Sequence, residues 1–228
     1  MTTELSMPPA SLLYLFGGDV LPHPHFSLSH LFTVEHTVRL PCQGGTVVLG
    51  PLESYLFGWT FWQLQDDGLV ELSLEQPQTT RIKKNDWLGL DVSVRRIATG
   101  PEPNGVLAEE VLARCGADPA LVANVIVAWG KAKGVDIHRM VYLPLDAIIE
   151  LIHLDTCNYL GVEPLPPGQS HLDCEEITLR RVEFAAVRRR FGEFADGHTD
   201  LAAALLRCCD AGLYRLRPPK YAPGAFGP

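Results

Sequence analysis

Apolar residues recur every three or four positions along much of the chain, and this spacing predicts helices. The predicted helices span residues 51–65, 106–114, 118–133, 145–160, 175–194 and 200–211. Other segments are short and rich in β-branched residues, or alternate apolar with polar residues, which is typical of strands. TVRLP and GTVVLG are predicted to pair as a hairpin across CQGG, and residues 69–75 form the next predicted strand. One or two strands follow within residues 79–97, with a turn at Asn85-Asp86, and LYRLRP is predicted as the final strand.

Local signals mark the ends of two of these helices. Pro51 suits a first helical position, and Gly68 suits the left-handed residue that follows a helix. Asp118 suits the N-cap of the helix 118–133, with Pro119 at its first position.

The helix 51–65 carries an aromatic cluster. Trp59, Phe61 and Trp62 lie within four positions of one another, in a segment that contains few polar residues. Large aromatic side chains contribute strongly to protein cores, and burial explains this cluster better than a role in a functional site. The sequence therefore predicts that the helix 51–65 lies at the centre of the core.

The order of elements predicts an α+β fold that is mostly α-helical, with one or two small β-hairpins. We expect an irregular N-terminal arm over residues 1–34, a single globular domain over 35–216 and a proline-rich tail over 217–228. FWQLQDDGLVELSL and LLRCCDAGLYRLRP share one pattern, an apolar helix followed by Gly, Leu and a strand. This pattern is typical of winged-helix units and suggests an internal duplication.

The net charge of −8 is distributed unevenly along the 228 residues. Residues 1–176 hold 10 Lys/Arg and 22 Asp/Glu, a balance of −12, whereas residues 177–228 hold 9 and 5, a balance of +4. The overall acidity argues against non-specific nucleic-acid binding and favours a protein partner over DNA. The basic end of the chain is compatible with an anionic membrane surface.

The cysteines indicate a reducing compartment. None of the six forms a Cys-x-x-Cys pair, and their spacing shows no secretory disulfide framework. The first ten residues lack the basic start of a signal peptide, and no apolar run reaches the roughly 18 residues of a membrane-spanning helix. We therefore expect a soluble, cytoplasmic protein without a transmembrane segment.

Five arginines lie on the helix predicted over 175–194. Its inward side is expected to hold Ile177, Val182 or Phe184, Val187 and Phe191. Arg181 and Arg188 are seven residues apart and share one side of the helix, and guanidinium groups suit bidentate binding of phosphate or carboxylate. The candidate anion or lipid contacts are Arg180, Arg181, Arg188 and Arg189. The alternative is a solvated outer side, with Glu183 or Glu193 as ion-pair partners.

Two short segments, HLDTC and HLDC, combine residue types that bind zinc. The candidate metal ligands are His153, Cys157, His171 and Cys174. His153 and Cys157 share one side of a predicted helix, but their spacing is not a structural zinc pattern, and buried cysteine commonly acts as a small hydrophobic residue. His23, His25 and His30 in the predicted arm form a weaker set.

Sequence motifs of nucleophilic catalysis and nucleotide binding are absent. The chain contains no G-x-S-x-G, no Walker A sequence and no G-x-G-x-x-G. The sequence therefore gives no support for nucleophilic catalysis or nucleotide binding, and we expect no cofactor.

Two segments carry a resemblance to a known family. YLFGWTFWQLQDDGLVELSLE and LGLDVSVRRIATGPEPNGVLAEEVLARC resemble the Golgi phosphoprotein 3 family and its bacterial relatives over about 60 residues. That family is mostly helical, binds phosphatidylinositol 4-phosphate at membranes and acts as an adaptor without enzymatic activity. Phe57 stands where the family has a lipid-binding arginine, and Val48 stands near the position of its tryptophan. No lipid-binding residue of the family is therefore carried over to this chain.

The resemblance and the basic helix together predict a non-enzymatic adaptor or binding protein that contacts anionic, phosphoinositide-type membrane peripherally. Two alternatives remain open. The repeated helix–Gly–strand pattern suggests a winged-helix-like interaction subunit of a protein complex, and the His/Cys segments suggest a metalloenzyme.

Overall fold

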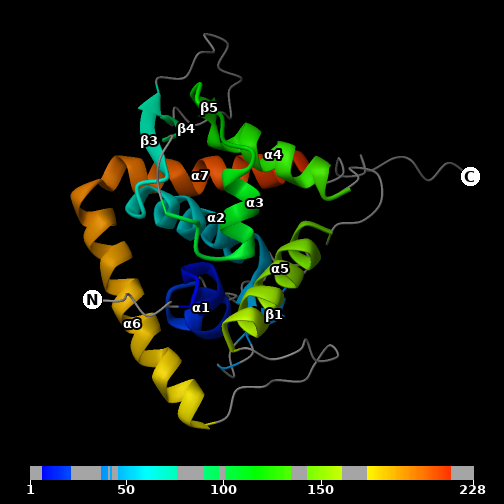
Figure 1. Cartoon of the computed structure of the whole chain (residues 1–228), viewed down its shortest axis with the longest axis vertical. Coiled ribbons are helices and arrows are strands. Elements are labelled where there is room, and N and C mark those ends of the chain that lie inside the picture. Colours follow the sequence, from blue (N-terminus) through cyan, green and yellow to red (C-terminus); the bar gives the residue numbers. More distant parts are fainter. Residues whose placement is uncertain are drawn as a thin grey trace, which may run out of the picture.

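A computed structural model describes residues 7–21, 37–40, 42, 46–75, 90–97, 101–134, 143–160 and 174–216, and it confirms a mostly helical α+β fold (Figure 1). The helices are α1 (Pro9–Phe16), α2 (Leu49–Asp66), α3 (Val106–Leu112), α4 (Val122–Ala132), α5 (Leu143–Leu160), α6 (Cys174–Gly197) and α7 (Thr199–Leu216), with a 3-10 turn, η1 (Gly17–Asp19). The strands are β1 (Thr37–Arg39), β2 (Thr46–Val48), β3 (Val70–Glu75), β4 (Asp91–Arg96) and β5 (Ala120–Leu121).

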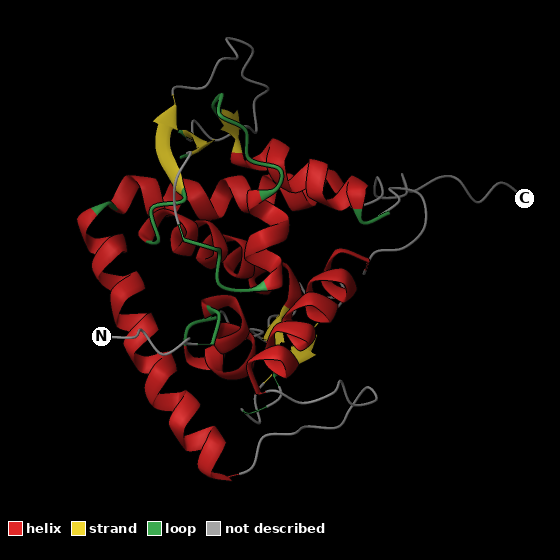
Figure 2. Ribbon diagram, in the orientation of Figure 1, coloured by secondary structure: helices red, strands yellow, loops and turns green. Residues whose placement is uncertain are grey.

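The strands form two small antiparallel sheets, which are minor beside the helical body (Figure 2). β1 pairs with β2, as the TVRLP and GTVVLG segments predict. In the other sheet the strand order is β3-β4-β5, with Val70 opposite Arg96 and Ser93 opposite Leu121. The turn predicted at Asn85-Asp86 lies outside the described residues.

Helix α2 is the central helix of the core, as its aromatic residues predict. It contacts α1, α3, α5 and α7, and Trp59, Phe57 and Phe61 are fully buried. Gly68 has φ +71°, so the predicted left-handed position after the helix is confirmed. The N–H of Gly68 donates to the carbonyl of Gln65, and the N–H of Leu69 donates to the carbonyl of Leu64. This Schellman motif satisfies the last carbonyls of α2 and turns the chain into β3.

Helices α4 and α7 pack closely because glycines lie at their contact. A Cβ atom at Gly212 of α7 would lie 2.9 Å from the carbonyl oxygen of Ala123 and 3.0 Å from Cβ of Ile126, both on α4. A Cβ atom at Gly130 of α4 would lie 2.4 Å from Cδ1 of Leu216 on α7. The two backbones therefore approach one another at a distance that larger residues do not permit.

The expectation of an irregular arm over residues 1–34 is wrong for residues 9–19. Pro9 occupies the start of α1, where a missing N–H costs nothing, and the helix buries Leu12, Leu13, Leu15 and Phe16. A helix that is apolar on all sides is stable only when it is surrounded by protein, and α1 contacts α2, α5 and α6. The segment containing His23, His25 and His30 lies outside the described residues, as does the predicted tail 217–228.

The predicted final strand is also wrong, because α7 continues through LYRL to Leu216. Leu213 and Leu216 are three residues apart, which is a helical rather than a strand spacing, and both are buried beside Cys209. Gly212 lies inside the helix because α4 passes next to it. Within the described residues the second half of the proposed duplication is therefore helix and not strand, and a second winged-helix-like unit is not confirmed.

The helix predicted over 118–133 begins later, at Val122. Ala120 and Leu121 instead extend the sheet by pairing with Val94 and Ser93 of β4, so Asp118 does not cap the helix. The other predicted helices are observed with shifts of a few residues at their ends.

Candidate anion-binding surface

Helix α6 runs along one edge of the molecule and contacts α1 and α7 (Figure 1). Phe184 and Val187 face inward and are buried, whereas Val182, the alternative inward residue, is 67% exposed. Phe184 lies 6.1 Å from Phe16 of α1 and 5.9 Å from Trp59 of α2, measured between ring centroids. These aromatic contacts fix the rotation of α6 about its axis, and so they decide which arginines face solvent.

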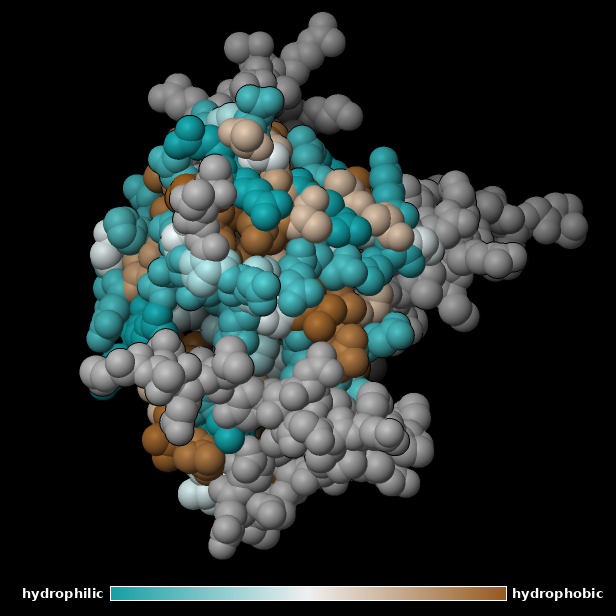
Figure 3. Space-filling model, in the orientation of Figure 1, coloured by the Kyte–Doolittle hydropathy of each residue, from teal (hydrophilic) through white to brown (hydrophobic). Residues whose placement is uncertain are grey.

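The exposed side of α6 between residues 178 and 189 combines arginines with apolar residues and bears no exposed carboxylate. Its exposed members are Thr178, Leu179, Arg181, Val182, Ala185, Ala186, Arg188 and Arg189. Leu179 is 54% exposed, and apolar atoms lie uncovered along this part of α6 (Figure 3). Basic residues beside exposed large apolar residues are typical of helices that lie against anionic lipid surfaces.

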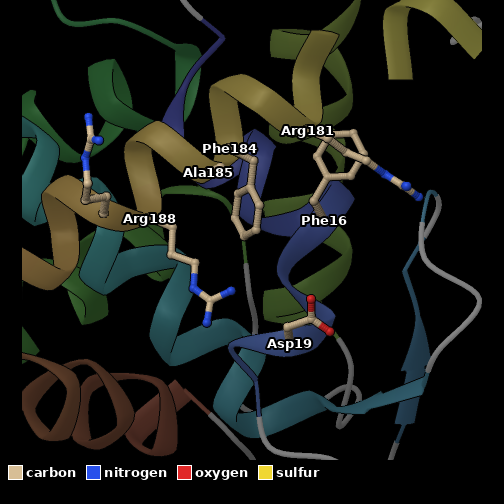
Figure 4. A pocket seen from close by; sticks show the side chains of 7 residues that line it. Phe16, Asp19, Arg181, Phe184, Ala185 and Arg188 are labelled. Atoms are coloured by element: carbon tan, nitrogen blue, oxygen red, sulfur yellow. The ribbon is translucent and has the colours of Figure 1, made fainter. Parts of the chain in front are cut away.

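An open cavity of about 630 Å³ lies between α6, α1 and η1. Its lining residues are Phe16, Asp19, Arg181, Phe184, Ala185, Arg188 and Arg189. Arg181 and Arg188 extend from α6 on either side of Phe184, and Asp19 of η1 lies across from Arg188 (Figure 4). Three of the four candidate anion contacts therefore line one cavity.

Arg180, the fourth candidate, is separated from the others and has a structural contact. Its side chain is buried, and its Nη1 lies 2.6 Å from Oε2 of Glu183. The other oxygen of Glu183 accepts a hydrogen bond of 2.6 Å from the N–H of Met7, just before α1. Arg180 thus helps to tie α6 to the start of α1 and is not part of the cavity.

The remaining arginines of α6 differ in their contacts. Arg181 donates from Nη2 to the carbonyl of Cys42 at 3.4 Å, and Nε of Arg189 lies 3.8 Å from Oε1 of Glu193 at the surface. Arg190 pairs with Asp66 and lies 5.9 Å from the ring centroid of Trp62, which joins α6 to the end of α2. Arg188 has neither a hydrogen bond nor an ion pair within the part of the chain that the structure describes.

Sequence reasoning missed Phe16 and Asp19 as members of this site. Both lie within residues 1–34, for which the sequence predicts an irregular arm, and such an arm has no defined position relative to α6. The signal that predicts their placement is the apolar run after Pro8-Pro9, in which Leu12, Leu13 and Phe16 have helical spacing.

The metal-ligand prediction is only partly within the described structure. His153 lies on α5 and is half-buried. Cys157 and Cys174 belong to α5 and α6, but their side chains lie outside the description, and so does His171. Among the described residues, no three His, Cys, Asp or Glu side chains form a group that could hold a metal ion.

The described cysteines other than Cys42 are buried. Burial raises the pKa of the Cys115 thiol to about 11, and burial also raises the pKa values of Cys208 and Cys209. A nucleophilic cysteine requires a lowered pKa, because the thiolate is the reactive form. These three residues therefore act as core hydrophobic residues.

Asp155 of α5 is a buried carboxylate at the start of α3. It is 4% exposed and accepts a hydrogen bond at Oδ1 from the N–H of Val106, while its Oδ2 has no partner within the described structure. Gly105 precedes α3 with φ +108°, and a Cβ atom there would lie 3.1 Å from Oδ2 of Asp155 and 2.8 Å from Cγ of Pro8. Burial raises the pKa of Asp155 to about 6, while hydrogen bonds from the N–H groups of Val106 and Leu107 lower it in part.

We predict that this carboxyl makes the protein more stable in mild acid. Its folded pKa of about 6 exceeds the ordinary value of 3.8, so its stabilising contribution is fully present below pH 3.8 and is lost as the pH rises through 6. At about 1.4 kcal/mol per pKa unit, the contribution amounts to roughly 3 kcal/mol. Urea denaturation of wild type and Asp155→Asn between pH 4.5 and 7.5 should show this slope only in the wild type. Equal slopes in both proteins would contradict the prediction.

Comparison with known proteins finds no matching family model, no matching curated protein and no matching solved structure. None of the helices within the described residues is both long enough and apolar enough to span a membrane.

Proposed function

We propose that this protein is a non-enzymatic, cytoplasmic adaptor, similar in role to the Golgi phosphoprotein 3 family, that contacts anionic, phosphoinositide-type membranes peripherally through α6. The observation that supports this proposal best is the exposed surface of α6, which carries Arg181, Arg188 and Arg189 together with Leu179 and Val182 and bears no exposed carboxylate between residues 178 and 189. A protein partner bound elsewhere on the molecule completes the adaptor role.

Electrostatics and burial act together in this arrangement. An arginine close to an anionic lipid surface contributes about 1 kcal/mol, and salt screens this attraction over roughly 10 Å. Leu179 and Val182 lie on the same exposed side of α6, where they can enter the boundary between headgroups and acyl chains. The overall charge of −8 opposes binding, so the contact depends on the orientation that places α6 against the lipid.

Flotation with vesicles tests the proposal. We expect the wild type to float with vesicles that contain phosphatidylglycerol or phosphatidylinositol phosphate and to remain unbound with vesicles of phosphatidylcholine alone. From about 1 kcal/mol per arginine, the double variant Arg181→Gln/Arg188→Gln should lower partitioning roughly 10- to 30-fold. Leu179→Ser/Val182→Ser should weaken binding while retaining the preference for anionic lipid.

A matched control removes the same charge elsewhere. Lys131 on α4 and Arg207 on α7 are both exposed, and Lys131→Gln/Arg207→Gln changes the net charge by the same amount as the α6 variant. We expect the control to float like the wild type. Equal losses in the two double variants would show a net-charge effect without an oriented surface, and absence of wild-type binding would refute the membrane contact.

A further inference from the structure

The cavity beside α6 holds opposite charges that do not neutralise one another. Asp19 and Arg188 both line it, from η1 and α6 respectively. Within the described residues, neither side chain has an ion pair or hydrogen bond, although they face one another across the cavity (Figure 4). Arg181 lies on the other side of Phe184, with only a long hydrogen bond to the carbonyl of Cys42. The cavity thus has an anion-binding part and a separate carboxylate.

This pairing of charges selects among anionic ligands. A guanidinium binds phosphate strongly through charge-assisted hydrogen bonds, and Arg188 is the arginine that faces Asp19 across the cavity (Figure 4). A phosphate dianion beside Asp19 would meet a like charge at short range, and this repulsion lowers affinity. A ligand that carries an ammonium group next to its phosphate satisfies both Arg188 and Asp19. Placement of both charges in one cavity therefore favours a zwitterion over a polyanion.

We infer that this cavity binds a zwitterionic phosphodiester of the phosphoethanolamine type, with the phosphate on Arg188 and the ammonium on Asp19. The inference rests on the proposed function, because it takes the ligand to be a lipid headgroup at the surface that α6 contacts. Exposed Leu179 and Val182 on the same helix favour a headgroup over a free small molecule. The arginines of α6 then attract the protein to anionic membrane, and the cavity recognises the zwitterionic lipid within it.

Calorimetric titration with soluble headgroups tests this assignment. The probes are glycerophosphoethanolamine, glycerol 3-phosphate and glycine. We expect the wild type to bind glycerophosphoethanolamine roughly tenfold more tightly than glycerol 3-phosphate, and to bind glycine more weakly than either. Equal or tighter binding of glycine would reassign the cavity to free amino acids and overturn the headgroup inference.

Two variants separate the roles of the opposite charges. Asp19→Asn should reverse the order, so that glycerol 3-phosphate binds more tightly than glycerophosphoethanolamine, because the repulsion and the ammonium contact are both removed. Arg188→Gln should weaken both phosphate probes by tenfold or more. Lys131→Gln, on α4, serves as the control and should match the wild type. Asp19 is exposed, and circular dichroism should show that Asp19→Asn remains folded.

The outcomes distinguish this inference from the proposed function. Flotation of the wild type with phosphatidylglycerol vesicles alone tests membrane contact without any zwitterionic lipid. Three results would show that the headgroup inference is wrong: the protein prefers glycerol 3-phosphate, it binds neither phosphate probe, or Asp19→Asn leaves the order of probe affinities unchanged. If the protein nevertheless floats with these vesicles, the membrane proposal stands. If the probes bind in the expected order but no vesicles are bound, the cavity recognises a free phosphodiester and the lipid source is wrong.

Discussion

Replacing Trp59 with alanine is expected to lower the free energy of unfolding by about 3–5 kcal/mol, the usual loss for a buried tryptophan. Trp59 is fully buried and stacks on Phe184 with a centroid distance of 5.9 Å and an interplanar angle of 21°. It also lies 5.1 Å from Phe191, between ring centroids, so one side chain of α2 contacts two aromatic residues of α6. Truncation therefore leaves a cavity and loosens the attachment of α6.

Urea denaturation at fixed pH measures this loss. The control is Tyr214→Ala on α7, which removes a side chain of a residue that is 62% exposed and should change stability by less than about 0.5 kcal/mol. Trp59→Phe should cost less than Trp59→Ala, because the phenyl ring refills part of the cavity. The indole N–H has no hydrogen-bond partner within the described residues, so neither variant loses a hydrogen bond there. A loss below about 1 kcal/mol for Trp59→Ala would contradict a central role for this residue in the core.

Because Phe184 lines the cavity and also stacks on Trp59, the stability variant has a functional consequence. We expect Trp59→Ala to weaken vesicle binding even though Trp59 contributes no charge, since the position of Arg181 and Arg188 depends on the rotation of α6. Trp59→Ala keeps every charged residue of α6. A loss of vesicle binding in this variant would therefore come from the changed position of the arginines and not from a change in charge.

Replacing Gly212 with alanine is expected to destabilise the protein by about 1–3 kcal/mol, through overpacking between α7 and α4. Its new Cβ would lie 2.9 Å from the carbonyl oxygen and 3.1 Å from Cα of Ala123. These are backbone atoms that cannot rotate away, so the two helices must separate. The intrinsic helix preference of alanine over glycine, about 1 kcal/mol, acts in the opposite direction and is outweighed.

Gly192 on α6 provides the matched control for this change. It is also inside a helix, and a Cβ atom there would meet nothing within 4 Å. Gly192→Ala should therefore stabilise the protein by roughly 0.5–1 kcal/mol through backbone entropy alone. Opposite signs for the two variants in thermal or urea denaturation are the expected result. A stabilising Gly212→Ala would show that α4 and α7 are not in close contact.

Local patterns were sufficient to predict α2 and the chain reversal after it. Pro51, the apolar spacing and Gly68 act within a few residues of one another, so their effect does not depend on distant parts of the chain. The same holds for β3 and for the hairpin of β1 and β2. The burial of Trp59 and Trp62 follows from the same pattern, since few polar residues share their helix.

Long-range contacts decided the elements on which local signals were ambiguous. The sequence around Gly212 fits the end of a helix as well as its interior. Only the passage of α4 beside Gly212 explains a glycine within α7. Ala120 and Leu121 form a strand because β4 lies next to them, although Asp118-Pro119 resembles a helix start. Helix α1 is short and apolar on all sides, and it is stable because α2, α5 and α6 surround it.

The sequence by itself determined the mostly helical α+β fold, the central aromatic helix and the basic character of the helix that became α6. Only the tertiary structure decided which arginines share a site. Contacts of Phe184 with Phe16 and Trp59 set the rotation of α6, which places Arg180 on Glu183 and leaves Arg181 and Arg188 at the cavity. The same packing places Asp19 across from Arg188. Periodicity places residues on one side of a helix, but the neighbour of that side is fixed by contacts between segments far apart in sequence.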